Sequence, residues 1–330
     1  MTNFLTAAGA EISSTSERAE VLSVANFPPF LLEPLNAACT VHQRLHETDP
    51  AAFALAAPRI RAIAASGESK VSAELIAQLP ALEIISVMGV GYDGVDVAAA
   101  KARGVMVTHT PGVLNDDVAD LAFALMLGWA RQIATADRFV RAGAWPSGPL
   151  PLGRKVSGAR LGIVGMGRIG QAIALRGAAF GMPIAYTARS AKPALPHTFY
   201  ASAKELAANS DFLVLITPGG AGTHKLIDAA VLKALGPTGC VINVARGSVI
   251  DETALIEALQ AGAIAGAALD VFENEPHVPQ ALRNLPNVLL SPHIGSATAQ
   301  TRRAMAELAF ANLQAQLAGK PVLTAVPECQ

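Results

Sequence analysis

Arg246, Glu275 and His293 each follow closely on a short apolar run in the second half of the chain. Such runs have the composition of buried strands, and open α/β sheets bind ligands beyond the carboxyl ends of their strands. A guanidinium can hold a carboxylate and polarise the adjacent ketone, while an imidazole can deliver a proton. A carboxylate on the other imidazole nitrogen fixes the tautomer and favours the protonated form. The three residue types together fit hydride transfer to a 2-keto acid.

Each of these residues also has a plainer interpretation. Arg246 can cap a loop, Glu275 can be a surface charge before a proline, and His293 can be a histidine with satisfied hydrogen bonds. Spacing along the chain does not by itself decide between these interpretations and a catalytic set.

A glycine-rich turn in the middle of the chain is the clearest binding signal. Residues 161–170 read LGIVGMGRIG, which predicts a buried strand, a turn and the start of a helix. Gly165 permits the tight turn, Gly167 lets the backbone approach a pyrophosphate, and Gly170 lets the helix pack close to the strand. The helix N-terminus adds free N–H groups and a partial positive charge. The turn therefore predicts dinucleotide binding; the alternative is a glycine-rich turn with no ligand.

The residues after this turn favour NADP over NAD. An NAD site expects an acidic residue about 20 residues beyond the glycines, and Thr187 stands near that position instead. Residues 138–204 contain no Asp or Glu but ten Lys or Arg. Arg189 could pair with a 2′-phosphate and Ser190 could donate a hydroxyl. If Arg189 is an ordinary solvated charge, NADH remains possible with lower preference.

Short apolar runs alternate with helical segments along most of the chain, which predicts an α/β fold with doubly wound parallel sheets. Helical segments are expected over 72–79 and 95–103. A long amphipathic helical segment is expected over 116–141, and a Gly/Pro-rich loop follows it at 143–149. The expected strands are 21–25, 40–44, 62–65, 84–87 and 105–108, then 161–164, 183–187, 212–216, 240–244, 266–269 and 288–290.

A last helix over 299–317 has no new unit after it, so we expect it to return to the first domain. The predicted substrate domain therefore comprises 1–108 and 297–330. The dinucleotide-binding domain, 109–296, is inserted between these parts, with a cleft between the two domains.

The composition argues against several other classes of protein. The formal net charge of −1 suggests no nucleic-acid or anionic-lipid partner. Cys39, Cys240 and Cys329 are scattered and have no metal-ligand spacing, so we expect no metal and a reduced, cytoplasmic setting. Residues 1–16 lack the pattern of a targeting segment, and no long uncharged apolar run predicts a membrane span.

The sequence resembles the D-isomer-specific 2-hydroxyacid dehydrogenase family over about residues 84–298. The matching motifs are 86–93 (SVMGVGYD), 110–114 (TPGVL), 165–170 (GMGRIG), 243–252 (NVARGSVIDE), 269–276 (LDVFENEP) and 292–298 (PHIGSAT). This resemblance implies a Rossmann domain inserted into a flavodoxin-like substrate domain. It places Arg246, Glu275 and His293 on the family's catalytic residues.

The resemblance also assigns binding roles. It implies that the backbone of Val90 and Gly91, together with Arg246, binds the substrate carboxylate, and that Asp270 lies near the nicotinamide carboxamide. The residues expected to bind the cofactor are Gly165, Gly167, Arg168, Ile169, Gly170, Arg189, Ser190, Thr217, Pro218, Val244, Ala245, Asp270, His293 and Gly295.

Family members are usually dimers, and the long helical segment after residue 116 is expected at the interface. In the most similar subgroup a loop tryptophan reaches the neighbouring active site. Trp145 is the candidate here, and the alternative is that it covers its own domain.

Within the family, residues 143–146 and 186–190 look most like the NADPH-dependent glyoxylate/hydroxypyruvate reductases. The resemblance implies reduction of small 2-keto acids to D-2-hydroxy acids, with His293 as the acid. Glu275 argues against the formate dehydrogenase branch, which carries an amide there. Two alternatives stay open: a reductase of a bulkier 2-keto acid, such as an aryl pyruvate or 2-ketogluconate, and a dinucleotide-sensing corepressor.

Overall fold

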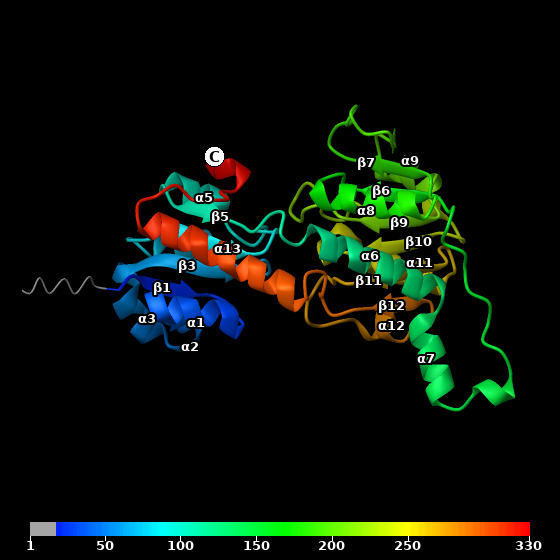
Figure 1. Cartoon of the computed structure of the whole chain (residues 1–330), viewed down its shortest axis with the longest axis horizontal. Helices are drawn as coiled ribbons and strands as arrows, with labels where there is room; N and C mark the ends of the chain where they lie inside the picture. Colours follow the sequence, from blue (N-terminus) through cyan, green and yellow to red (C-terminus); the bar gives the residue numbers. More distant parts are fainter. Residues whose placement is uncertain (1–17) are drawn as a thin grey trace, which may run out of the picture.

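Two parallel β-sheets organise the protein, and helices cover both faces of each, as the computed structural model of residues 18–330 shows (Figure 1). The first sheet has the strand order β2-β1-β3-β4-β5 and the second β12-β11-β10-β9-β6-β7-β8. The expected pair of parallel-sheet α/β domains is thus confirmed. The expectations for residues 1–16 lie outside the described residues.

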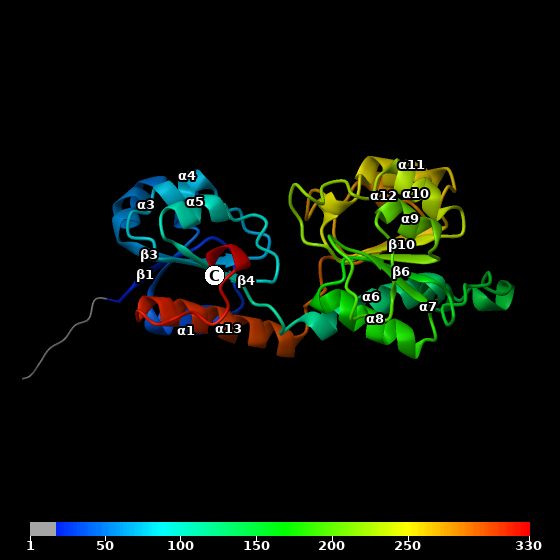
Figure 2. The same cartoon turned by 90° about the horizontal axis from the view of Figure 1, so that it is seen from above.

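The first sheet has the flavodoxin-like order. Strand β4 is buried on both faces: Ile84 and Met88 face one hydrophobic cluster, and Ile85 and Val87 face another. Helices α1 and α13 cover one face, and α3, α4 and α5 cover the other (Figure 2). The strands are β1 (Glu20–Ser23), β2 (Thr40–Gln43), β3 (Ile60–Ser66), β4 (Ile84–Met88) and β5 (Met106–Thr108). The helices are α1 (Pro29–Ala38), α2 (Leu45–Thr48), α3 (Pro50–Ala56), α4 (Ala73–Ala77), α5 (Val97–Ala102) and α13 (Ala299–Leu317).

The second sheet has the Rossmann order, extended by one strand at an edge. Helices α6 and α8 cover one face, and α9, α10 and α11 cover the other (Figure 2). The strands are β6 (Leu161–Val164), β7 (Ile184–Thr187), β8 (Thr198–Phe199), β9 (Phe212–Leu215), β10 (Cys240–Asn243), β11 (Gly266–Leu269) and β12 (Val288–Leu290). The helices are α6 (Asn115–Ala130), α7 (Ile133–Arg141), α8 (Arg168–Ala179), α9 (Ala203–Ala208), α10 (Ala229–Leu235), α11 (Glu252–Gln260) and α12 (Gln280–Arg283).

The chain passes between the two sheets twice. The first crossing leads from β5 into α6, which packs on α8 and β11 of the second domain. The second leads from β12 into α13, which returns to β4 and α1 as predicted. Ser86 Oγ donates to Ala309 O at 2.8 Å and seats α13 on β4. Thr298 Oγ1 donates to Asp117 Oδ2 at 2.5 Å, so the two crossings are bonded to each other.

The structure corrects two sequence-based expectations. The helical segment expected over 116–141 is broken, because Gln132 adopts a left-handed backbone with φ 53° between α6 and α7. Strand β8 was not foreseen, since two residues at a sheet edge carry too little apolar pattern to be recognised.

Candidate active site

His293 and Glu275 form a close pair beyond the ends of β11 and β12. His293 Nδ1 lies 2.6 Å from Glu275 Oε2, and the other oxygen, Oε1, accepts the backbone N–H of Phe272 at 2.8 Å. Both carboxylate oxygens are therefore engaged, which holds the carboxylate and, through it, the imidazole. Nδ1 is the proton donor in this contact, so Nε2 is left as the nitrogen that can serve a substrate.

Electrostatics in this pair favour an imidazolium facing a carboxylate. Burial alone would lower the pKa of His293, but the hydrogen bond and charge of Glu275, with the charge of Glu68, outweigh burial and raise it. Burial alone would raise the pKa of Glu275, but the hydrogen bonds from His293 and Phe272 outweigh it and lower that pKa. The raised pKa of His293 favours the protonated form, which is the form that a general acid needs.

Asp270 holds the backbone that carries His293. Its carboxylate accepts hydrogen bonds from Ser291 Oγ at 2.6 Å and from the N–H groups of Ile294 and Gly295, each at 2.9 Å. The N–H of His293 donates to Asp270 O at 2.8 Å. His293 adopts φ 51°, a left-handed conformation that is unusual for a non-glycine residue. These bonds keep the loop in that conformation, so Asp270 is well placed to fix the position of the imidazole.

Arg246 reaches from the end of β10 to the first domain. Its Nε lies 3.2 Å from Asp93 Oδ1, and its Nη1 donates to Ala245 O at 2.8 Å. The guanidinium also packs directly against Gly91, since a Cβ there would lie 1.6 Å from Nη2. Gly91 therefore has to lack a side chain for the guanidinium to sit beside the backbone of the first domain.

The backbone of Val90 and Gly91 presents open donors at this contact. Neither N–H group has a hydrogen-bond acceptor among residues 18–330. Two free N–H groups beside the guanidinium form a cradle for an anionic group of carboxylate size.

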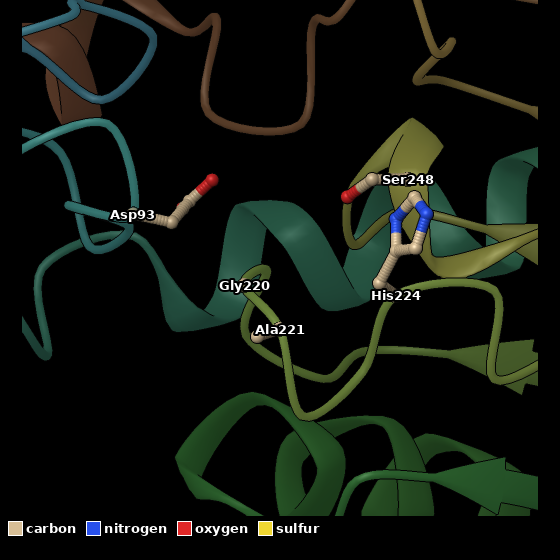
Figure 3. Close-up of a pocket in the computed structure, with 5 residues that line it drawn as sticks. All are labelled: Asp93, Gly220, Ala221, His224 and Ser248. Atoms are coloured by element: carbon tan, nitrogen blue, oxygen red, sulfur yellow. The ribbon is translucent and has the colours of Figure 1, made fainter.

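A cavity of about 460 Å³ opens between the domains next to Asp93. Gly220, Ala221, His224 and Ser248 of the second domain complete its lining. Figure 3 shows Asp93 on one side of the space, with Ser248 and His224 on the other. The cleft predicted between the two domains is therefore a feature of the structure.

The glycine turn has the geometry required for a dinucleotide. Gly165 has φ 105°, and a Cβ there would lie 2.7 Å from Ile216 O. A Cβ at Gly170 would lie 2.1 Å from Gly165 O, so α8 can pack this closely only with glycine. Around Gly167, by contrast, a Cβ would meet nothing within 4 Å. That open space lies at the N-terminus of α8, where no side chain caps the first turn.

Neighbouring residues support the same site. Thr217 Oγ1, at the end of β9, is buried and has no hydrogen-bond partner among the described residues. Val244 and Ala245 follow β10, and Asn243 Oδ1 accepts the N–H of Ala245 at 3.0 Å to hold that turn. An unsatisfied hydroxyl and an open helix N-terminus at the switch point between β6 and β9 fit a bound NAD(P).

At the end of β7, the structure separates the roles of neighbouring residues. Thr187 is buried and its carbonyl accepts the N–H of Gly165 at 2.9 Å. Arg189 and Ser190 are exposed, and Arg189 forms no ion pair with any residue between 18 and 330. Arg189 is thus available to a ligand phosphate, whereas Thr187 is part of the fold.

Trp145 lies on an exposed segment of the second domain and does not line the cavity beside Asp93. It begins a short 3-10 helix (Trp145–Ser147), and 67% of its surface is exposed. The segment after α7 extends away from the second sheet in Figure 1. Most of the Trp145 side chain is therefore uncovered in the single chain, and both interpretations of its role stay predictions.

Two carboxylates of the first domain and a histidine directly after its last strand were not singled out by sequence reasoning. Glu68 Oε1 lies 3.2 Å from His293 Nδ1, Asp93 pairs with Arg246, and His109 Nδ1 lies 3.0 Å from Val90 O. All three follow strands of the first sheet, β3, β4 and β5. The rule that sites lie beyond the carboxyl ends of strands would have found them if applied to that sheet.

The Rossmann sheet, the glycine turn and the Arg–Glu–His set together define a two-domain oxidoreductase with an NAD(P)-binding domain. Residues 123–295 match the D-isomer specific 2-hydroxyacid dehydrogenase, NAD binding domain. Hydroxyphenylpyruvate reductase from Plectranthus scutellarioides is 50% identical over 274 residues, 83% of this chain and 88% of that protein. The protein belongs to the D-isomer-specific 2-hydroxyacid dehydrogenase family.

Two further relatives extend the match to nearly the whole chain. A 2-ketogluconate reductase from Gluconobacter oxydans is 44% identical over 311 residues, 94% of this chain and 99% of that protein. The crystal structure of an NADPH-dependent glyoxylate/hydroxypyruvate reductase from Sinorhizobium meliloti, in complex with NADP and malonate, superposes with a TM-score of 0.89. That chain is 44% identical, and the match covers 94% of this chain and 98% of the other.

Among residues 18–330, no helix is both long and apolar enough to span a membrane.

Proposed function

We propose that this protein reduces small 2-keto acids, glyoxylate and hydroxypyruvate first among them, to D-2-hydroxy acids with NADPH. The observation that carries the proposal is the meeting of three groups at one cleft. These are the His293–Glu275 pair, the Arg246 guanidinium and the free N–H groups of Val90 and Gly91. A 2-keto acid needs an anion site for its carboxylate and an acid for its ketone oxygen, and this cleft offers both.

The residues of the cleft have different roles in the proposed reaction. The Val90–Gly91 backbone and Arg246 bind the substrate carboxylate, and Arg246 also polarises the ketone. When bound, the nicotinamide supplies the hydride to the keto carbon. His293 transfers its Nε2 proton to the ketone oxygen, while Glu275 keeps the Nδ1 proton in place and stabilises the charged imidazole before transfer. Addition of one hydride and one proton converts the ketone to the alcohol.

We further propose that the domain boundaries at 108/109 and 296/297 act as a hinge. Two observations support this proposal: the chain passes between the sheets in these two segments, and the Thr298–Asp117 hydrogen bond joins them. Closing the cleft at this hinge would exclude water from the reacting groups and strengthen their electrostatic interactions.

A panel of five keto acids tests the substrate. NADPH oxidation is measured with glyoxylate, hydroxypyruvate, pyruvate, phenylpyruvate and 2-ketogluconate, and the hydroxypyruvate product is resolved on a chiral column. We expect the highest kcat/KM with glyoxylate or hydroxypyruvate and a D product. A higher value with phenylpyruvate or 2-ketogluconate would support the bulkier-substrate alternative. If none of the five keto acids supports NADPH oxidation while NADPH still binds, the enzymatic proposal is overturned and the dinucleotide-sensing alternative is favoured.

Arg189 should determine the preference for NADPH. Because Arg189 is exposed and has no ion pair with a described residue, it can pair with a 2′-phosphate. We expect Arg189→Ala to weaken NADPH binding by about tenfold and leave NADH binding within about twofold. Lys204→Ala, which removes an exposed positive charge from the same domain, is the matched control. If the ratio of the NADPH and NADH affinities is the same in Arg189→Ala and wild type, Arg189 does not bind the 2′-phosphate.

We propose that the protein works as a homodimer in which Trp145 reaches the partner's active site. Apolar side chains are exposed along α7 and the segment after it: Ile133 (58%), Val140 (55%), Trp145 (67%) and Leu152 (97%). Covering such a surface with a second copy would remove it from water. Light scattering coupled to size-exclusion chromatography should give twice the monomer mass, and a monomer at micromolar concentration would contradict the proposal.

A further inference from the structure

The peptide group that joins Val90 to Gly91 is held by a contact to its carbonyl oxygen. His109 Nδ1 lies 3.0 Å from Val90 O, and the same peptide carries the free N–H of Gly91. In a trans peptide the C=O and N–H bonds point in opposite directions. A hydrogen bond that fixes the carbonyl oxygen therefore also fixes the direction of the Gly91 N–H.

His109 is itself held firmly at the end of β5. Its backbone N–H donates to Thr324 O at 3.2 Å, and Thr324 Oγ1 donates to His109 O at 2.6 Å. Its ring meets the ring of Tyr92 edge-on, with centroids 5.3 Å apart. The hydroxyl of Tyr92 lies 3.0 Å from Glu328 Oε2. The C-terminal segment therefore supports the imidazole on both its backbone and its ring.

The chemistry of the contact determines the protonation state that it needs. A carbonyl oxygen only accepts, so Nδ1 must carry a proton, which the neutral Nδ1–H tautomer provides. Burial lowers the pKa of His109; the hydrogen bond to Val90 opposes this and the charge of Arg168 adds to it. Glu328 also faces the group and opposes the shift. The imidazole can thus donate as a neutral group at pH 7, without placing a second charge beside the substrate.

We propose that His109 is a positioning residue for substrate binding: its Nδ1–H holds the Val90 carbonyl so that the Gly91 N–H points at the substrate carboxylate. The proposal rests on the proposed function, because it takes the Val90–Gly91 backbone as the carboxylate site. His109 touches neither the ketone nor the hydride path. Its loss should therefore weaken binding of the keto acid without slowing proton transfer.

Two substitutions separate the hydrogen bond from the bulk of the ring. His109→Leu removes the donor, whereas the amide of His109→Asn can place an N–H where Nδ1 stands. We expect His109→Leu to raise the KM for glyoxylate by about tenfold, with kcat and the Kd for NADPH within about twofold of wild type. His109→Asn should restore KM to within about threefold of wild type. An unchanged KM in His109→Leu, or a KM in His109→Asn as high as in His109→Leu, would overturn the proposal.

A matched control and a second pair of variants distinguish loss of the hydrogen bond from a general loss of structure. His46→Leu makes the same substitution at another partly buried histidine of the first domain, and it should leave KM unchanged. If His109→Leu does not fold, His109→Asn is compared with His109→Gln, whose amide reaches the position of Nε2 rather than Nδ1. The glutamine variant should then show the higher KM, and equal KM values for the two variants would overturn the proposal.

Failure of the proposed function has a different signature. In that case wild type turns over none of the keto acids, and the variants are compared by binding of oxamate, a non-reducible mimic of a 2-keto acid, to the NADPH complex. Weaker oxamate binding in His109→Leu than in wild type and His109→Asn supports the role of His109. Equal binding by all three proteins overturns it.

Discussion

The two sides of the cleft contribute different kinds of groups. The second domain presents reactive side chains, Arg246 and the His293–Glu275 pair, at the ends of its strands. The first domain presents the backbone N–H groups of Val90 and Gly91, and carboxylates that meet those side chains from across the cleft. In the proposed reaction, the second domain supplies the reacting side chains, and the first domain binds the substrate carboxylate and completes the electrostatics.

The contacts of His293 show what this difference means. Glu275 lies 2.6 Å from Nδ1 and belongs to the same domain, so this contact does not depend on how far the cleft is open. Glu68 lies 3.2 Å from the same nitrogen, is 62% exposed and belongs to the other domain. The effect of Glu275 on the pKa of His293 is therefore permanent. The effect of Glu68 on the same pKa depends on the position of the domains and on salt.

The largest effect should come from removing the acid itself. We expect His293→Ala to lower kcat by about a thousandfold, because a positioned general acid contributes roughly 10²–10⁴ to rate. NADPH affinity, measured by fluorescence titration, should stay within about threefold, since the glycine turn and Arg189 lie elsewhere. Near-normal turnover would show that the reactive side of the cleft has been misassigned.

Removing the carboxylate of the same domain should be second. Reduction requires a protonated His293, and Glu275 helps to raise its pKa. Activity is therefore present below that pKa and lost as pH rises through it. In Glu275→Gln the pKa of His293 should fall, so that the alkaline limb of the kcat profile moves to lower pH. A limb at the wild-type position would contradict this role of Glu275.

Removing the carboxylate across the cleft should have the smallest effect. Glu68→Gln should move the alkaline limb in the same direction but by less than Glu275→Gln does, because an exposed charge is screened by solvent. The difference in pH profile between Glu68→Gln and wild type should shrink further in about 0.5 M salt, because salt at that concentration screens charges over a few ångströms. Glu74→Gln, an exposed carboxylate on α4, is the control. A shift equal to that of Glu275→Gln would erase the distinction between the two sides.

Most of the fold could be predicted from local patterns. Every expected strand is present within a few residues of its predicted bounds, because strands buried on both faces leave continuous apolar runs. The break at Gln132 could not be foreseen, since neither Gly nor Pro marks it. Its left-handed backbone is held by packing and hydrogen bonding at the end of α6, including the Gln132 N–H to Trp129 O bond of 3.1 Å.

Local sequence patterns were enough to predict the class of both sheets, the dinucleotide turn and the three residue types of the proposed site. These depend on apolar periodicity and on short-range spacing, which are properties of neighbours along the chain. Which groups of the first domain meet these residues depends on how the folded chain brings distant segments together. Glu68 is far from His293 in sequence, and Asp93 is far from Arg246, so no local pattern could pair them. The same holds for His109 and Val90, whose contact exists because β4 and β5 lie side by side and end at the same edge of one sheet.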